Sequence, residues 1–207
     1  DDLEVFAGQM AVFDPGDGNR VFITAAATTI DGIEIPGFAS WDGAQWRAEA
    51  EANGYVDLVD AVDYGHGEVL ILGGGFSSIE GVPAKRLAEW DGVQWSAIGP
   101  RVNGDPRAVA AFDDGSGPAL FVLGAFKTAG DGTPVMGIAK WDGQKWSSLA
   151  GGAKGGDGGI PTVGHELHVY DFGAGGRLLA KGIWPASKGG WLQEQVCMWN
   201  GSIWQPA

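Results

Sequence analysis

The segment that decides the fold is Trp90-Asp-Gly-Val-Gln-Trp95, because closely similar segments occur at three other places in the chain. They are Trp41-Asp-Gly-Ala-Gln-Trp46, Trp141-Asp-Gly-Gln-Lys-Trp146 and Trp199-Asn-Gly-Ser-Ile-Trp204. The first tryptophans of the four segments are 49, 51 and 58 residues apart. A period near fifty residues indicates an array of small units, each of which buries its apolar face against a neighbour.

Each repeat reads as four short strands, which are plainest in residues 55–99. Asp57–Val62 is a β-prone run and Val69–Leu72 is a continuous apolar strand. Arg86–Trp90 and Gln94–Ile98 then flank the Asp-Gly step. We expect a type I′ hairpin at this step, with positive φ at both the aspartate and the glycine.

Two further columns of the repeat surround the apolar strand. A turn of the form Asp-x-Gly-x-Gly precedes it and begins at Asp14, Asp63, Asp113 and Asp171. A small residue follows it, and we expect this residue to let backbone pass close beneath a neighbouring tryptophan. The small residues are Ala25, Gly74, Gly124 and Gly182.

Four four-stranded antiparallel units predict an all-β fold, a β-propeller of four blades. We expect one domain over residues 1–207, with residues 1–6 continuing the preceding outer strand or connection. The approximate blades are 7–50, 54–99, 105–150 and 162–207. Joined end to end, the termini keep the repeat spacing, with 17 residues from Trp204 to Asp14. The chain is therefore either a closed four-bladed ring or a partial ring, completed by a second copy or by missing blades.

Composition excludes some classes of partner. A formal charge of −13 argues against a nucleic-acid surface, which needs clustered basic residues. No apolar run is long enough to predict insertion into a membrane. The single cysteine, Cys197, occupies the column of Ala39, Ala88 and Ala139, so we interpret it as an inert core thiol.

The segment Leu72-Gly-Gly-Gly-Phe76, together with Trp90 and Trp95, resembles the kelch motif. The resemblance covers nearly the whole chain, and the blades look similar to tandem blades of secreted bacterial multidomain proteins. It implies a binding or scaffolding module in an extracellular or periplasmic location. Repeat 1 departs from the motif, with Ala25-Ala26 in place of the glycine pair, and repeat 3 departs with Gly124-Ala125. Nothing in the chain matches the copper site of galactose oxidase, a kelch-type enzyme.

The motifs that would indicate catalysis, metal binding or phosphate binding are weak in this chain. His165-Glu-Leu-His168 is half of a zinc-protease signature, but residues three apart on a strand face opposite ways. The Asp-x-Gly-x-Gly turns lack the ligand set of a calcium loop. The glycine-rich insertion 151–159 lacks the ending of a phosphate loop, so we expect a surface loop. A channel site in an enzyme would depend on Asp57, Asp60 and Glu166.

Repeat 4 differs most from the others and is where we predict ligand binding. Trp184 replaces Phe76 and Phe126, and a longer loop follows it. The predicted ligand-binding residues are Trp184, Lys188, Trp191, His165 and His168. The alternative is that Trp184 and Trp191 only fill space. The eight signature tryptophans are predicted to be structural: Trp41, Trp46, Trp90, Trp95, Trp141, Trp146, Trp199 and Trp204.

Three functions remain in competition. The first is a non-catalytic binding or scaffolding propeller module for a protein or cell-surface partner. The second is a carbohydrate-binding, lectin-like propeller, and the third is a hydrolase or lyase with a channel site. We predict no cofactor and no metal. A homodimer or a larger parent array stays open.

Overall fold

The computed structural model describes residues 7–25, 29–30, 32–35, 37–130, 132–135, 137–149, 163–171, 173, 176–184, 193–199, 201 and 203–207. Every regular element in these ranges is a β-strand, which confirms the predicted all-β class. Among the same residues, none forms a helix long and apolar enough to cross a lipid bilayer.

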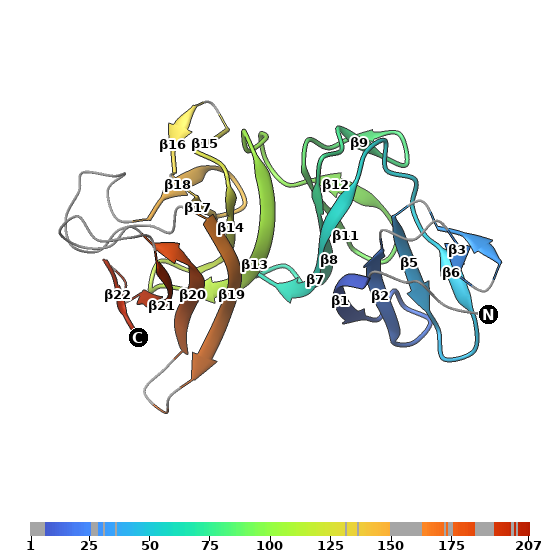
Figure 1. Ribbon diagram of the computed structural model, residues 1–207, viewed down its shortest axis with the longest axis horizontal. Coiled ribbons are helices and arrows are strands. Elements are labelled where there is room, and N and C mark those ends of the chain that lie inside the picture. Colours follow the sequence, from blue (N-terminus) through green and yellow to red (C-terminus); the bar gives the residue numbers. More distant parts are fainter. Residues whose placement is uncertain are drawn as a thin grey trace. The chain divides into compact units, whose positions relative to one another are not determined.

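The strands form four antiparallel sheets of four strands, each like a propeller blade (Figure 1). Sheet 1 consists of β1 (Ala7–Phe13), β2 (Arg20–Ala25), β5 (Phe38–Trp41) and β6 (Trp46–Ala48). Sheet 2 consists of β7 (Val56–Asp63), β8 (Glu68–Gly74), β11 (Leu87–Trp90) and β12 (Trp95–Ala97). Sheet 3 consists of β13 (Asp105–Asp113), β14 (Pro118–Ala125), β17 (Ile138–Trp141) and β18 (Trp146–Ser148). Sheet 4 consists of β19 (Val163–Asp171), β20 (Gly176–Trp184), β21 (Gln193–Trp199) and β22 (Trp204–Pro206).

A short two-stranded ribbon interrupts the loop between the second and third strands of sheets 1, 2 and 3. The ribbons are β3 (Thr29–Ile30) with β4 (Ile33–Glu34), β9 (Ser78–Ile79) with β10 (Val82–Pro83), and β15 (Thr128–Ala129) with β16 (Thr133–Pro134). Each ribbon contacts the last strand of its own sheet. The sequence pattern predicts only a polar loop here. A strand of two residues is too short to show the alternation of polar and apolar side chains that reveals a strand.

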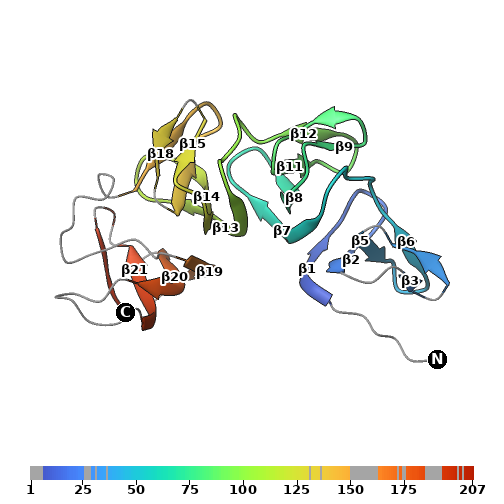
Figure 2. The ribbon, with the colours of Figure 1, turned by 45° about the horizontal axis from the view of Figure 1, so that its top comes forward.

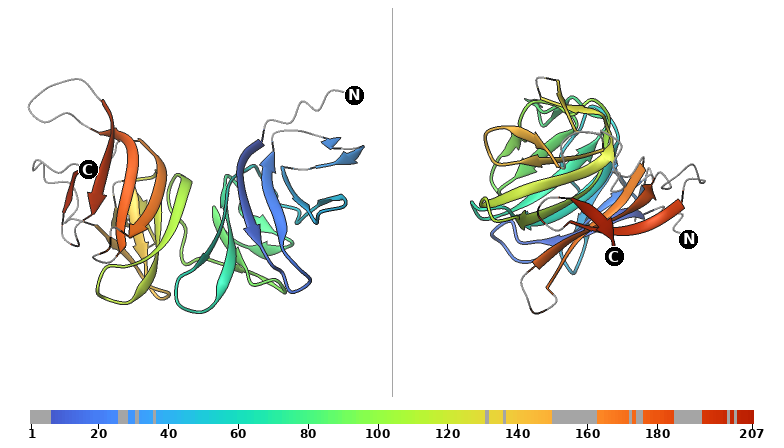
Figure 3. Two further views of the ribbon diagram at one scale, coloured as in Figure 1. Left: turned by 90° about the horizontal axis from the view of Figure 1, so that it is seen from below. Right: turned by 90° about the vertical axis from the view of Figure 1, so that its left-hand side faces the viewer.

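The chain divides into two compact units, Asp1–Ile98 with sheets 1 and 2, and Gly99–Ala207 with sheets 3 and 4. Within the first unit, β1 lies beside β7, and within the second, β13 lies beside β19. Figure 2 and Figure 3 show the strands of each sheet running side by side.

The two tryptophans of each signature face each other across the last hairpin of a sheet. Their ring centroids lie between 5.2 and 5.8 Å apart in the four repeats. Aromatic pairs at this distance stabilise a hairpin beyond the area that they bury. The register pairs Trp41 with Trp46, Trp90 with Trp95, Trp141 with Trp146, and Trp199 with Trp204.

The turn inside each tryptophan pair is not the type I′ hairpin that we expected. Gly43 has a φ of 96°, whereas Asp42 has no positive φ. Instead, the Asp42 carboxylate accepts hydrogen bonds from the backbone N–H groups of Ala44 and Gln45, both at 2.9 Å. Asp91 and Asp142 make the same two bonds in their repeats. The prediction was wrong because the aspartate side chain satisfies the turn itself and needs no left-handed backbone.

The Asp-x-Gly-x-Gly turns join the first two strands of each sheet by the same chemistry. The Asp14 carboxylate accepts hydrogen bonds from the N–H groups of Gly16 at 2.8 Å and Gly18 at 2.9 Å. Asp63 and Asp113 accept the equivalent pair. The glycine N–H bonds hold the pKa of Asp14 and of Asp63 below the ordinary value.

Aromatic side chains join the two sheets of the first unit. The Trp90 ring lies 5.8 Å from Phe13 and 6.1 Å from Phe22, both on sheet 1, measured between centroids. In the second unit, Phe121 of sheet 3 and Trp199 of sheet 4 belong to one buried cluster. Cys197 lies in that cluster, and burial raises the pKa of its thiol to about 11, as expected for an inert core cysteine.

The small residue after the second strand serves a different purpose from the one expected. A Cβ on Gly74 would lie 2.1 Å from the carbonyl oxygen of Tyr55, and a Cβ on Gly124 would lie 2.2 Å from that of Asp105. Both contacts are with the first strand or the residue before it, where the register shifts by a β-bulge. The glycine column therefore accommodates the bulge within one sheet rather than a neighbouring tryptophan.

A polar pair ties the first turn of a sheet to its third strand, and its chemistry changes between repeats. In sheet 2, the Tyr64 hydroxyl donates to the carboxylate of Glu89. Burial, together with this carboxylate, raises the pKa of Tyr64. In sheet 3, Lys140 occupies the position of Glu89 and donates to Asp114 Oδ1 at 2.6 Å. The position before the first tryptophan of a pair thus accepts an acidic or a basic side chain, provided that the turn supplies a suitable hydrogen-bond partner.

Candidate functional site

The predicted ligand-binding residues of repeat 4 lie only partly within the described part of the chain. Lys188 and Trp191 lie outside it. Trp184 is the last residue of β20, where its backbone pairs with Gln193 of β21. The glycine-rich insertion 151–159 also lies outside the described residues.

The two predicted ligand-binding histidines, His165 and His168, lie on β19 and are exposed. His165 falls at a register shift between Gly164 and Glu166, so it has no partner in the pairing of β19 with β20. His168 Nε2 lies 3.6 Å from Glu166 Oε2. Glu166 also accepts a hydrogen bond from Lys181 Nζ at 2.8 Å, and this bond lowers the pKa of Glu166. The structure thus places His168 in a surface charge cluster with Glu166 and Lys181, and among the described residues the interactions of this cluster do not involve His165.

Within the part of the chain that the structure describes, no group of three or more His, Cys, Asp or Glu side chains has the proximity that would hold an ion.

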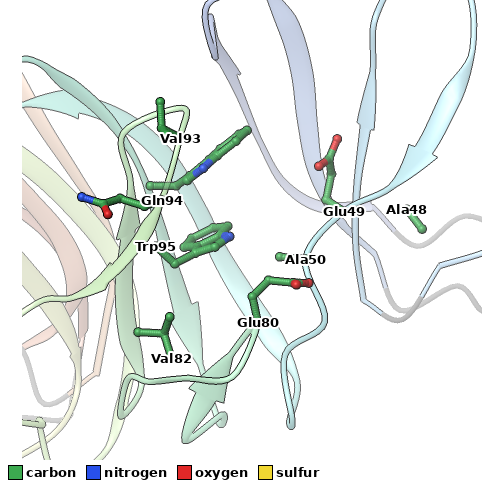
Figure 4. A pocket seen from close by; sticks show the side chains of 9 residues that line it. Ala48, Glu49, Ala50, Glu80, Val82, Val93, Gln94 and Trp95 are labelled. Carbon is green, nitrogen blue, oxygen red and sulfur yellow. The ribbon is translucent and has the colours of Figure 1, made fainter.

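A cleft in the first unit brings together residues that the sequence analysis did not predict to bind a ligand. It lies where the end of sheet 1 and the connection to sheet 2 meet the last hairpin of sheet 2 and the β9–β10 turn (Figure 4). Its volume is about 610 Å³, within the range of roughly 300–1,000 Å³ that is usual for ligand sites. It is lined by Ala48, Glu49, Ala50, Glu80, Val82, Trp90, Val93, Gln94 and Trp95.

Trp95 is the aromatic wall of this cleft. Its ring stacks on Trp90 with centroids 5.8 Å apart and an interplanar angle of 16°. Figure 4 shows the Trp95 ring on the side of the hairpin that faces Ala50 and Glu80, whereas the Gln94 amide points away from them. The side chain is half-buried, and its ring nitrogen makes no hydrogen bond to another described residue.

The equivalent tryptophan of the next repeat, Trp146, is closed off. It is 7% exposed, and its ring nitrogen donates a hydrogen bond to the carbonyl oxygen of Pro100 at 2.8 Å. Gly99 lies so close that a Cβ there would come within 2.9 Å of the Trp146 ring nitrogen. The connection over Trp146 therefore fills the space that is open beside Trp95.

The sequence of the connection explains this difference. Asn103 follows Trp95 by eight positions, whereas Asn53 follows Trp46 by only seven. The two asparagines are structurally equivalent. Asn53 Oδ1 and Asn103 Oδ1 each accept hydrogen bonds from two backbone N–H groups of the loop after the second strand. The shorter connection has no Gly-Pro step, and the Trp95 ring beside it is only half-buried.

Glu49 places a carboxylate where other repeats bury a hydrocarbon. Its N–H donates to Phe38 O at 3.2 Å, as the N–H of Ile98 donates to Leu87 O at 3.3 Å, so the two positions are equivalent. Ile98 is 2% exposed. Glu49 instead accepts a hydrogen bond from the Ser40 hydroxyl, and Arg20 Nη1 lies 3.6 Å away. Its charge is thereby partly balanced.

Glu80 is the second acidic residue of the cleft and has an unusual backbone. Its φ is 46°, a region that L-residues other than glycine, asparagine and aspartate rarely enter. Gly130 takes the same place in sheet 3, with a φ of 60°. Glu80 Oε1 accepts the N–H of Glu51 at 2.7 Å, and this bond holds the side chain at the cleft.

The cleft therefore combines an indole, two carboxylates and the Gln94 amide. These groups can bind a ligand by stacking, hydrogen bonding and charge, and they include no nucleophile with an adjacent base. One signal in the sequence could have revealed the site: Glu49 in a column that is otherwise aliphatic, with Ile98 and Leu149. Comparisons of the chain with models of protein families, with curated proteins and with solved structures give no significant match.

Proposed function

We propose that this chain is a non-catalytic binding module that holds a protein partner through the cleft at Trp95. The observation that carries the proposal is the contrast between Trp95, which is open to a cleft, and Trp146, which is covered by the connection and hydrogen-bonded. A half-buried tryptophan flanked by polar groups is a frequent anchor in protein interfaces.

The scaffold supports this function because the aspartates that recur in its turns serve to hold the backbone in place. The turn carboxylates accept backbone N–H groups, as at Asp14 and Asp42. Rigid sheets of this kind present a preorganised surface, which lowers the entropy cost of binding.

A lectin-like function is the second candidate. The Trp95 ring forms one wall of the cleft, and Glu80 lies across from it (Figure 4). An aromatic face opposite a hydrogen-bond acceptor also suits a sugar ring. The same experiment must therefore offer both ligand classes.

The experiment compares wild-type protein with Trp95→Leu and with Trp46→Leu, which changes the equivalent tryptophan of sheet 1 outside the cleft. Each protein is presented to a displayed peptide library and to a glycan array. We expect peptides to be enriched on the wild type and on Trp46→Leu, but not on Trp95→Leu. Binding of glycans alone, or peptide enrichment that is unchanged by Trp95→Leu, would overturn the proposal.

The kelch-type classification and an extracellular or periplasmic location are part of the same proposal. The kelch type is supported by the glycine run before Phe76, which is buried beside the β8 end. Detection of the protein in the culture medium or periplasm of its source cell tests the location, and detection only in the cytoplasm contradicts it.

A further inference from the structure

The cleft is acidic on one wall and aromatic on the other. Glu80 and Glu49 bring two carboxylates to it, and Glu51, which is exposed, follows directly in the connection. Among the described residues, no Lys or Arg side chain forms an ion pair with Glu80, whereas Glu49 has Arg20 at 3.6 Å. The uncompensated negative charge of the cleft therefore belongs to Glu80.

A ligand that covers this cleft must balance that charge. Burying a carboxylate without a partner costs free energy, since water no longer solvates it. A neutral sugar would hydrogen-bond to Glu80 but would leave its charge in place. A cation would neutralise it.

The shape of the other wall selects the kind of cation. The Trp95 ring is a flat face at the cleft, and its ring nitrogen is a hydrogen-bond donor with no described acceptor. A planar guanidinium stacks on an indole and still donates to a carboxylate at its edge. The peptide backbone next to it supplies a carbonyl that can accept from the ring nitrogen.

We propose that the Trp95 cleft binds an arginine side chain of the partner, stacked on the Trp95 indole and paired with the Glu80 carboxylate. This inference rests on the proposed protein-binding function and specifies its ligand. The overall charge of −13 attracts a basic segment at long range, and the cleft gives that attraction a position.

The test uses a fluorescently labelled peptide, Gly-Arg-Gly-Arg-Gly, and its twin with both arginines replaced by citrulline. Citrulline keeps the planar shape of arginine and lacks its charge. Anisotropy titrations are done with wild-type protein and four variants: Trp95→Leu, Trp46→Leu, Glu80→Gln and Glu68→Gln. Glu68 is exposed at the start of β8, outside the cleft, so Glu68→Gln makes the same change of net charge as Glu80→Gln.

We expect the arginine peptide to bind wild type at least about tenfold more tightly than the citrulline peptide. Trp95→Leu and Glu80→Gln should each weaken binding by about five- to tenfold. Trp46→Leu and Glu68→Gln should change it by less than about twofold. Circular dichroism and thermal melting establish that each variant is folded.

The remaining outcomes distinguish a failure of the arginine assignment from a failure of the proposed protein-binding function. Equal losses for Glu80→Gln and Glu68→Gln would mean that the acidic surface attracts the peptide without a site, and this overturns the inference. Equal binding of both peptides, still lost in Trp95→Leu, overturns the arginine assignment and leaves a protein-binding cleft. Binding of maltohexaose that depends on Trp95, with no binding of either peptide, overturns both.

Discussion

Glu80 and Gly130 occupy the same position of neighbouring repeats and share a left-handed backbone, with φ of 46° and 60°. In sheet 3 the glycine stands against the covered tryptophan, since a Cβ on Gly130 would lie 3.2 Å from Trp146 Cδ1. In sheet 2 a glutamate holds the same conformation at an open cleft. Non-glycine residues with such a backbone are common at sites that bind ligands.

The strain at Glu80 can be measured by comparing two substitutions. Glu80→Gly and Glu80→Ala remove the same side chain and its bond to Glu51, but only glycine tolerates the positive φ. We expect Glu80→Gly to be more stable than Glu80→Ala by about 1 kcal/mol in urea unfolding. Equal stability of the two variants would show that this backbone is unstrained.

Gly74→Ala should destabilise the protein, because the new Cβ would lie 2.1 Å from a backbone oxygen that cannot move aside easily. We expect a loss of about 1–3 kcal/mol in the free energy of unfolding, measured with urea. Gly176→Ala is the control, since its nearest neighbour would be a Val169 methyl carbon at 3.3 Å. If Gly74→Ala proves as mild as Gly176→Ala, the bulge assignment is wrong.

Trp90→Ala should cost about 3 kcal/mol or more, because its indole contacts Phe13 and Phe22 of the neighbouring sheet. The control is Val93→Ala in the same hairpin, where the side chain is 88% exposed and little stability should be lost. A melting temperature that is the same for both variants contradicts the packing of sheet 1 on sheet 2.

Acid should weaken the fold through its turn aspartates. The N–H groups of Gln45 and Ala44 hold the pKa of Asp42 below 3.8, and Asp91 and Asp142 are lowered in the same way. Because the folded pKa is lower than the unfolded one, the stabilisation is complete above about pH 4–5 and is lost as the pH falls through the folded pKa. Urea midpoints should therefore stay level from pH 7 to 5, as far as these groups are concerned, and decline below pH 4.

The triple variant Asp42→Asn, Asp91→Asn and Asp142→Asn tests the source of that decline. Asparagine keeps an acceptor oxygen but does not titrate, and the fourth repeat already has Asn200 at this position. We expect the decline below pH 4 to be shallower in the variant than in the wild type. An identical pH profile would assign the acid sensitivity to other groups.

Much of the fold could be predicted because repetition samples the same requirement four times. The pairing of Trp90 with Trp95 and the existence of the apolar strand at 69–72 follow from columns that agree between repeats, although the strand is longer in the structure, Glu68–Gly74. The role of Gly74 could not be inferred, since a register shift on the opposite strand leaves no mark in the sequence. The turn at Asp42 was misjudged because Asp-Gly is compatible with two different turn chemistries.

The site was missed for a different reason. Attention to the most divergent repeat led to Trp184 and its loop, whereas the cleft arises from one fewer residue in the connection over Trp95. Such a deletion alters what covers a side chain without altering the side chain. Glu49 in the column of Ile98 and Leu149 was the readable sign, because a carboxylate there replaces a buried hydrocarbon.

The equivalent tryptophans Trp95 and Trp146 differ in cover, since Trp95 lines the cleft and Trp146 is 7% exposed. Hydrogen exchange of the two indole N–H groups reports this difference, resolved by ¹H–¹⁵N NMR and assigned with Trp95→Phe and Trp146→Phe. We expect fast exchange at Trp95 and strong protection at Trp146, whose N–H is bonded to Pro100. Equal protection of the two indoles would contradict it.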